Sequence, residues 1–268
     1  MTKILVIGDA MQDEYLWGTS TRLSPEAPVP VVSVQRTEKR PGGAANVAAN
    51  IEAMGVPVAR IFGGGERIRK LRIIAGNQHV ARIDYDYQQI AIQPDAAFRD
   101  ALDRCDMVVA VDYGKGALAN VQALMDAANG KPFLIDPKGH DYARYRGATL
   151  IKPNREEMRD VIGGWGSQDY LDSKAQRILN EFDIGSILLT QAADGMTLYT
   201  DTATLHEPSQ NHAPLDVSGA GEAALSAYAA ALVNGYELAS CLRFAAKAAG
   251  IAISRQGTTV CTQEEVFG

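Results

Sequence analysis

The feature that most constrains this chain is a series of short, continuous apolar runs, bounded by turn residues and separated by helical patterns. Five runs have the length and composition of strands buried on both faces: residues 4–7, 107–111, 133–135, 149–151 and 187–190. Helical patterns lie between them, at residues 44–54, 95–104, 121–128, 155–162 and 173–182. Strands that alternate with helices predict an α/β fold, with a doubly wound, mostly parallel sheet flanked by helices.

Other segments do not fit a parallel sheet. Residues 29–35, 71–74 and 80–85 have the pattern of hairpin strands, with Asn77 in the turn between the last two. We interpret them as a small β flap or lid, contributed by about residues 11–40 and 66–90. Two Ala-rich helices, at about 219–234 and 238–254, follow, and the whole of 1–268 is predicted to form a single domain.

Composition narrows the functional classes. The 268 residues are 46% hydrophobic, which is ample for a large core. A net charge of −6 without a basic run disfavours nucleic acid as a partner. No apolar stretch has membrane-spanning length, and the N-terminus has the pattern of a buried strand rather than a signal peptide. Three widely spaced cysteines without a CxxC pair, and four scattered histidines, predict a cytoplasmic protein without a zinc site.

Residues 216–222, with the sequence DVSGAGE, point to phosphoryl transfer. A turn of small residues that opens a helix leaves backbone N–H groups free to bind an anion. The carboxylate of Glu222 stands beside that anion site. There it can take the proton of an attacking hydroxyl while the N–H groups hold the phosphate charge.

Two further motifs each allow two interpretations. Asp9 follows the first strand, where ligands bind in open α/β sheets, and it can either bind sugar hydroxyls or cap a turn. Gly42 and Gly43 open a helix whose first turn carries Asn46. That arrangement suits close approach by a ligand, and it equally suits tight helix packing through small residues.

Two more candidates lie after later strands. Asn154 and Glu157 share one face of the first turn of a helix, next to the run Asp136-Pro137-Lys138 of the preceding strand. They suit a Mg²⁺ ion held largely through water beside a triphosphate, or an ordinary helix N-cap. The segment from Thr190 to Gly195 is either one edge of a nucleotide site or a simple hairpin.

Taken together, these segments resemble the ribokinase/PfkB family of carbohydrate kinases, and within it the bacterial D-glycero-β-D-manno-heptose-7-phosphate kinases. The resemblance spans nearly the whole chain. It rests on residues 6–9, 23–32, 41–49, 82–84, 112–118, 135–139, 142–150, 154–157 and 216–221. The runs SPEAPVPV and RYRGATL are specific to the heptose-phosphate branch.

The resemblance implies a ribokinase-like fold, an ATP- and Mg²⁺-dependent activity, and a role for each matching residue. The sugar would be bound by Asp9, Gly42, Gly43 and Asn46, and its phosphate would be met by Lys70, Arg72 and Arg82. Mg²⁺-ATP would be organised by Asn154 and Glu157, and the nucleotide lined by Thr190, Gly195 and Asp216. Gly219, Ala220 and Gly221 would form the anion hole, with Glu222 as the general base. A homodimer through the β flap is a further expectation.

The chain departs from the family pattern twice. The family has Asp as its base, so the carboxylate of Glu222 stands one methylene, or about 1.5 Å, further out. Residues 63–67 form a connector too short for the crossover helix that the family has after the strand at 58–62. Two hypotheses follow: a kinase that converts a heptose phosphate or a related sugar to its 1,7-bisphosphate, or a kinase-derived protein that binds nucleotide or sugar phosphate without efficient turnover.

Overall fold

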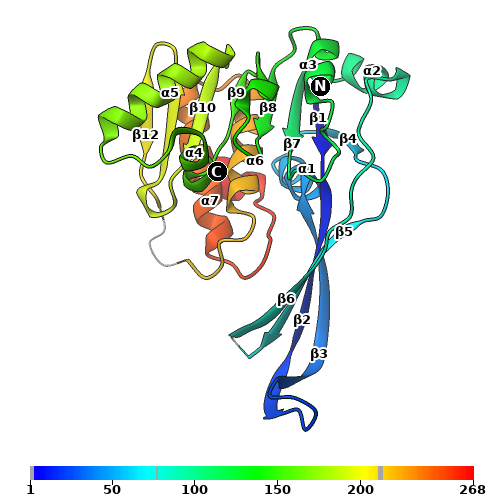
Figure 1. Cartoon of the computed structure of the whole chain (residues 1–268). Helices are drawn as coiled ribbons and strands as arrows, with labels where there is room; N and C mark the ends of the chain where they lie inside the picture. The colour runs from blue at the N-terminus through cyan, green and yellow to red at the C-terminus, as the bar shows by residue number, and fades with distance from the viewer. Residues whose placement is uncertain (1–2, 77, 211–213) are drawn as a thin grey trace.

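The computed structural model describes residues 3–76, 78–210 and 214–268, which form an α/β body and a long flap projecting from it (Figure 1). The body is built on an eight-stranded sheet of order β12-β11-β10-β9-β8-β7-β1-β4. Its strands are β1 (Ile4–Gly8), β4 (Val58–Phe62), β7 (Met107–Val111), β8 (Phe133–Asp136), β9 (Leu150–Ile151), β10 (Ser186–Thr190), β11 (Met196–Thr200) and β12 (Thr204–Glu207).

Pairing within this sheet is parallel from β4 to β10, and only β11 and β12 run antiparallel to their neighbours. The predicted mostly parallel sheet is therefore confirmed. The carboxyl ends of the parallel strands meet at one edge of the sheet, where ligands bind in folds of this kind.

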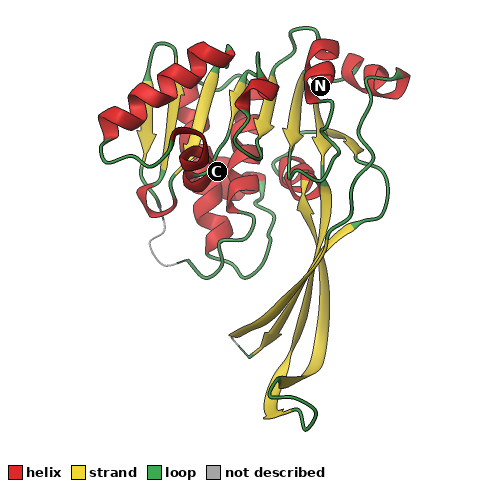
Figure 2. Cartoon of the chain, in the orientation of Figure 1, coloured by secondary structure: helices red, strands yellow, loops and turns green. Residues whose placement is uncertain are grey.

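Helices cover both faces of the sheet, as Figure 2 shows in red against yellow strands. Residues of one strand alternate between the two cores, so that Ile4 and Val6 pack on one side and Leu5 and Ile7 on the other. One core holds α1 (Ala44–Ala53), α6 (Ala220–Val233), α7 (Leu238–Ile253) and α8 (Gln263–Phe267). The other holds α2 (Ala96–Asp103), α3 (Val121–Ala128), α4 (Arg155–Ile162) and α5 (Gln168–Phe182), with the 3₁₀ turn η1 (Tyr142–Tyr145).

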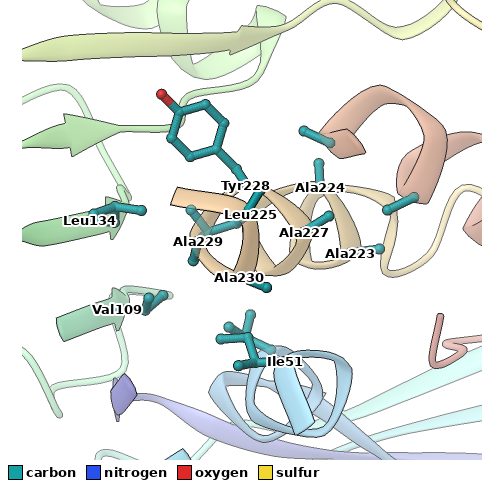
Figure 3. Packing of buried hydrophobic residues seen from close by; sticks show 14 of the residues in the cluster. Ile51, Val109, Leu134, Ala223, Ala224, Leu225, Ala227, Tyr228, Ala229 and Ala230 are labelled. Carbon is teal, nitrogen blue, oxygen red and sulfur yellow. The ribbon is translucent and has the colours of Figure 1, made fainter. Parts of the chain in front are cut away.

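Helix α6 is central to the first core. Its residues from Ala223 to Ala231 are all buried, and most of them are alanines. Figure 3 shows this helix beside Ile51 of α1 and the sheet residues Val109 and Leu134, which belong to the same core. Because alanine side chains allow close approach on every side, the helix is fixed between the sheet, α1 and α7. Its N-terminus is thereby held at the carboxyl edge of the sheet.

The flap is a separate four-stranded sheet of order β3-β2-β5-β6. It consists of β2 (Ala10–Leu23), β3 (Pro30–Gly43), β5 (Ile68–Ala75) and β6 (Gln78–Tyr85), with only β2 and β5 parallel. The predicted flap strands are present but longer than expected, and β2 was not predicted. In β2, three polar residues precede the short apolar stretch Tyr15-Leu16-Trp17 and a mostly polar end follows it, so neither regular alternation nor a long apolar run marks the strand. The turn predicted at Asn77 lies outside the described residues.

Two details of the secondary structure bear on the predicted connector at 63–67 and the predicted helix at 173–182. Between Phe62 of β4 and Ile68 of β5 the chain forms no helix, as the short connector predicted. Helix α5 begins five residues earlier than position 173, at Gln168, because the Ser167 side chain accepts a hydrogen bond from the Tyr170 N–H and caps it there. Within the described part of the chain, the helices are too short or too polar for any one to cross a bilayer.

Close approach of two strands makes Gly8 sensitive to substitution. Its φ is +131°, and a Cβ there would lie 2.1 Å from the Val111 carbonyl oxygen. We expect Gly8→Ala to lower the free energy of unfolding by more than about 3 kcal/mol, because both strain and a backbone clash are introduced. Urea denaturation measures this.

Gly130→Ala is the matched control, since Gly130 also has a positive φ (+81°) but no atom within 4 Å of its Cβ position. Its cost should be limited to the backbone strain, about 1–2 kcal/mol. Equal losses in the two variants would contradict the close approach as the cause.

Candidate functional site

A cavity of about 660 Å³ opens at the carboxyl edge of the sheet, a size typical of small-molecule sites. It is formed where β7, β8, β9 and β10 end and where α4 and α6 begin. Its lining includes Tyr113, Asp136, Lys152, Asn154, Glu157, Thr190, Gly195, Ala220, Gly221 and Glu222. The structure thus brings together the predicted base, two of the predicted anion-hole residues and four of the predicted nucleotide residues, which come from segments far apart in the sequence. Gly219 caps α6 and is not in this lining, and Asp216 lines a second, smaller hollow beside Arg72.

The first turn of α6 forms one wall of this cavity. Gly219 caps the helix, and Ala220, Gly221 and Glu222 make up its first residues. A Cβ at position 221 would lie 3.1 Å from the Lys152 ammonium nitrogen, so a side chain there would crowd the lysine. The wall therefore combines a helix N-terminus with a nearby cation, and both favour a bound anion.

Two buried polar groups beside this turn lack a hydrogen-bond partner among the described residues. The Asn46 Nδ2 and the Thr258 Oγ1 are both buried and unpaired. A Cβ at Gly219 would lie 3.3 Å from the former and 3.4 Å from the Thr258 methyl carbon. Because an unpaired buried donor costs about 1–3 kcal/mol, these atoms support a polar ligand at the start of α6.

Glu222 is held by a group that the sequence did not single out. The Tyr113 hydroxyl donates a hydrogen bond to its Oε1. Burial, reinforced by the charge of Glu222, raises the pKa of Tyr113 well above its ordinary value. The phenol therefore stays protonated and acts as a donor to the carboxylate at the cavity wall.

A buried ion pair between Lys152 and Asp136 also lies beside the first turn of α6. The Lys152 ammonium is 3.0 Å from the Asp136 carboxylate, and the lysine side chain is only 4% exposed. Burial raises the pKa of Asp136 to about 6, even though Lys152 opposes the shift. Burial alone would lower the pKa of Lys152, but Asp136 outweighs it and holds the lysine charged.

Asp9 and Asp216 both hold loops in place. The Asp9 carboxylate is fully buried and accepts hydrogen bonds from the backbone N–H groups of Tyr113, Lys115 and Ala117. These contacts are those of the turn-capping alternative. The Asp216 carboxylate accepts from the N–H groups of Ser218 and Gly257. Burial would raise the pKa of Asp216, but these bonds outweigh it and keep the pKa below its usual value.

The cations predicted to meet a sugar phosphate lie on the flap but differ in their surroundings. Arg72 forms a buried ion pair with Asp13, whose carboxylate also lies against Gly42. Burial raises the pKa of Asp13, and Arg72 offsets only part of that shift. The Lys70 ammonium lies 5.1 Å from the centre of the Tyr113 ring, at the cavity. Arg82 instead pairs with Asp84 on exposed β6, and the structure does not bring it to either hollow.

Asn154 and Glu157 form a capping box at the start of α4. The Asn154 side chain accepts from the Glu157 N–H (2.9 Å), and the Glu157 side chain accepts from the Asn154 N–H (3.0 Å). Lys138 lies 3.2 Å from the other oxygen of Glu157. The N-cap alternative is therefore present. The side chains of Asn154 and Glu157 also line the cavity, where water molecules around a cation can still bind them.

Thr190 and Gly195 flank a hairpin between β10 and β11, closed by the short turn η2 (Ala192–Asp194). Both residues line the cavity. The hairpin and the nucleotide-edge interpretations of this segment are therefore compatible.

Comparisons with known proteins identify the family of this chain. Residues 90–265 match the model of the pfkB family of carbohydrate kinases. A D-β-D-heptose 7-phosphate kinase of Bordetella bronchiseptica is 39% identical over 99% of this chain and 95% of its own length. The chain belongs to the pfkB family of carbohydrate kinases. The resemblance stated from the sequence is confirmed, and the kinase is an enzyme of sugar phosphorylation.

Other relatives are longer than this kinase. The bifunctional protein HldE of Pseudomonas fluorescens is also 39% identical, over 98% of this chain but 62% of its own length. The chain thus spans under two thirds of these relatives. Among solved structures, Arabidopsis thaliana ribokinase, complexed with ribose and ATP, has a TM-score of 0.78 at 16% identity over 100% of this chain and 98% of its own. Escherichia coli phosphofructokinase-2 scores 0.77 at 17%, over 99% and 96%. The ribokinase-like fold is confirmed.

Sequence reasoning missed several residues in or beside the kinase's cavity. Tyr113, Asp13, Lys152 and Thr258 were not assigned roles, and Asp136 was noted only as part of a strand-end motif. A charged residue inside an otherwise apolar strand end, as at Lys152, is a signal that could have pointed to the site. Tyr113 and Thr258 carry no such signal, because only folding brings them to α6.

The raised pKa of Asp136 predicts how the free energy of unfolding depends on pH. The pKa of Asp136 is about 6 in the folded state, above the ordinary value of about 4 for an unfolded Asp. Between these two pH values, the native state therefore binds more protons than the unfolded state. The contribution of Asp136 to stability is therefore fully present below about pH 4 and is lost as pH rises through about 6. The difference in unfolding free energy between wild type and Asp136→Asn should fall over this window and then level off.

Chemical denaturation of both proteins at several pH values measures this difference. An Asp100→Asn variant, which removes an exposed carboxylate paired with Arg104, is the control and should show no such fall. A wild-type advantage that grows between pH 4 and 6 would contradict the assignment of a raised pKa to Asp136.

Proposed function

We propose that this kinase transfers the γ-phosphoryl group of ATP to the 1-hydroxyl of D-glycero-D-manno-heptose 7-phosphate or a related sugar phosphate. The observation that carries the proposal is the position of Glu222 on the first turn of α6, in one cavity with the residues expected at the nucleotide. The heptose 7-phosphate kinase name of a relative that aligns along nearly the whole chain supports the choice of sugar.

The roles of the residues follow from the charges that develop in the reaction. Glu222 takes the proton of the 1-hydroxyl as the sugar oxygen bonds to the γ-phosphorus and the bond to ADP breaks. The N–H groups of Gly219, Ala220 and Gly221 and the Lys152 ammonium stabilise charge on the phosphoryl oxygens. Asn46 supplies an unpaired amide donor to the sugar or the phosphate beside Gly219.

Mg²⁺ fits the residues at α4 in one mode only. No group of three or more His, Cys, Asp or Glu side chains able to hold a metal occurs in the described part of the chain. One carboxylate and one amide, Glu157 and Asn154, suit an ion that keeps several waters and takes phosphate oxygens as its other ligands. When bound, Mg²⁺ supplies positive charge to the triphosphate.

The flap provides the site for the sugar. Its inner face carries Asp13, Lys70 and Arg72, beside Gly42 and Gly43, and a second hollow of about 360 Å³ lies between Arg72 and the segment before α6. We infer that Gly42, Gly43 and Asn46 surround the sugar, while Asp9 holds the loop at residues 113–117 in place, and that Lys70 and Arg72 meet the sugar phosphate. Arg82 reaches that phosphate only if its pair with Asp84 opens. Thr190 and Gly195 bound the nucleotide side, whereas Asp216 lies at the second hollow.

The general-base role makes the main prediction. Glu222→Gln should lower kcat by about 10²- to 10⁴-fold, because no carboxylate accepts the hydroxyl proton, while ATP binding is retained. Mass spectrometry of the product formed from Mg²⁺-ATP and heptose 7-phosphate measures turnover, and titration calorimetry measures binding. Glu237→Gln, at the exposed N-cap of α7, is the control. Full turnover in Glu222→Gln would overturn the role.

The alternative function is that of a pseudokinase in a regulatory or partner role, and it is favoured by Glu222 and the missing helix after Phe62. Binding heat without a bisphosphate product in wild type would support it. Glu222→Asp then separates the causes. A large gain in rate would mean that only the base is displaced, and no gain would point to the shortened segment.

We further propose that the kinase forms a homodimer through the outer face of the flap. Leu71 and Ile83 stand opposite each other on that face, as do Leu16 and Ile73. Ile83 and Val34 are 42% and 50% exposed. Because strand residues alternate, this apolar face points away from the inner face that carries Tyr15 and Arg72.

Light scattering after size exclusion tests the dimer. Wild type should have the mass of two chains, and Val34→Lys/Ile83→Lys should be monomeric, because lysines on a covered apolar face are desolvated without partners. Leu238→Lys, at an exposed site on α7, should stay dimeric. A monomeric wild type would remove the proposal.

The remaining expectations concern the whole chain. We propose that residues 1–268 act as one kinase domain to which the flap contributes its inner face. A small sugar phosphate is the expected partner, and nucleic acid and membrane are not. A cytoplasmic location stays a prediction from the sequence.

A further inference from the structure

Glu222 lines the cavity, and its side chain has one more freely rotating bond than that of an aspartate. A general base must be aligned with the hydroxyl that it deprotonates, and a misplacement of about 1 Å can cost on the order of 10² in rate. The chain therefore needs something that fixes the carboxylate. Only one side-chain donor to Glu222 occurs among the described contacts, the Tyr113 hydroxyl.

We propose that Tyr113 is a positioning residue that holds the Glu222 carboxylate in line with the sugar hydroxyl, an inference that rests on the proposed kinase function. The phenol occupies Oε1. A carboxylate has a second oxygen with free lone pairs, so Oε2 is left to accept the substrate proton.

The Tyr113 ring is itself fixed on several sides. Its backbone N–H donates to the buried Asp9 carboxylate at 2.9 Å. A Cβ at Gly43 would lie 3.3 Å from the ring edge, so the start of α1 closes one side. The Lys70 ammonium, from flap strand β5, lies over the ring face at 5.1 Å from its centre. A rigid ring gives a hydrogen bond of defined direction, which a flexible donor does not.

The charges around Glu222 would displace its carboxylate if no donor held it. The carboxylates of Asp13 on β2 and Asp136 on β8 repel it, while Lys152 attracts it. Lys152 is already paired with Asp136, so its attraction is shared. Without Tyr113, the carboxylate would turn away from its acidic neighbours toward Lys152 and the anion site, away from a sugar on the flap side.

Lys70 extends the arrangement to the flap. The same ammonium that is expected to meet the sugar phosphate rests on the ring whose hydroxyl holds the base. Sugar binding on the flap and alignment of the base therefore involve one chain of contacts, Lys70 to Tyr113 to Glu222. The contacts run through side chains of flap strand β5, the loop after β7 and helix α6.

The test compares the kinetic effect of Tyr113→Phe in the wild-type chain and in the Glu222→Asp chain. Tyr113→Phe should lower kcat for heptose 7-phosphate by about 10- to 100-fold and leave KM for ATP unchanged, because the carboxylate is misplaced but the nucleotide site is intact. In the Glu222→Asp background the shorter carboxylate no longer reaches the phenol, so Tyr113→Phe should change kcat by less than about twofold. An unchanged kcat in wild type, or an equal loss in both backgrounds, would overturn the proposal.

Tyr199→Phe is the matched control. It removes a similar hydrogen bond from a buried phenol to a carboxylate, Asp172, at 2.9 Å and outside the cavity. Both Tyr→Phe variants should lose some stability, but only the one at Tyr113 should lose kcat. A kcat loss of the same size in Tyr199→Phe would mean that stability alone explains the effect.

A readout that needs no turnover separates this inference from the kinase function. In a double-mutant cycle of Tyr113→Phe and Glu222→Ala, the unfolding equilibrium constants should be coupled by about tenfold, because the two groups share a charge-assisted hydrogen bond. Additive effects would overturn the contact. If wild type forms no bisphosphate yet the coupling is present, the proposed function fails while Tyr113 still holds Glu222.

Discussion

The arrangement of the whole site depends on how tightly α6 packs. An almost continuously buried, Ala-rich helix leaves little freedom to slide or rotate against its neighbours, since each displacement would open voids on several sides at once. Its N-terminus, with Gly219 and Glu222, is therefore fixed relative to the carboxyl ends of the parallel strands. The backbone donors and the carboxylate act from that rigid position, and rigid donors stabilise developing charge without having to reorganise.

Around this fixed helix end, the fold concentrates buried charge. Asp13 pairs with Arg72 and Asp136 with Lys152, while Glu222 is held by the neutral Tyr113. Each ion pair is partly desolvated, and neither is evidence of added stability, because burial costs offset the attraction. Their arrangement serves the chemistry of the site. The carboxylates of Asp13, Asp136 and Glu222 lie between the nucleotide cavity and the flap, and Arg72 and Lys152 limit the repulsion among them.

The flap joins this site from the other side. Tyr15 on β2 accepts a hydrogen bond from the Thr258 N–H at 3.0 Å, and Arg40 on β3 donates to the carbonyl oxygens of Gln256 and Thr258. The neighbouring Gly257 N–H binds Asp216, which precedes the first turn of α6. The base of the flap is thus tied to the segment that leads into the anion site. The shortened connector after β4 leaves these contacts in place, since they are made by β2 and β3.

The sequence by itself determined the α/β fold, the order of most strands and helices, and the segments that form the cavity. Continuous apolar runs and the small-residue turn before α6 are local signals of buried strands and of an anion-binding helix end. It did not reveal β2, whose sequence has neither regular alternation nor a long apolar run, and it did not reveal that Tyr113 contacts Glu222. Only the tertiary structure decided that Tyr113, Lys70 and Glu222 meet and that Arg82 stays outside. Such contacts depend on the register of a separate sheet and on side-chain packing, and neither leaves a periodic trace in the sequence.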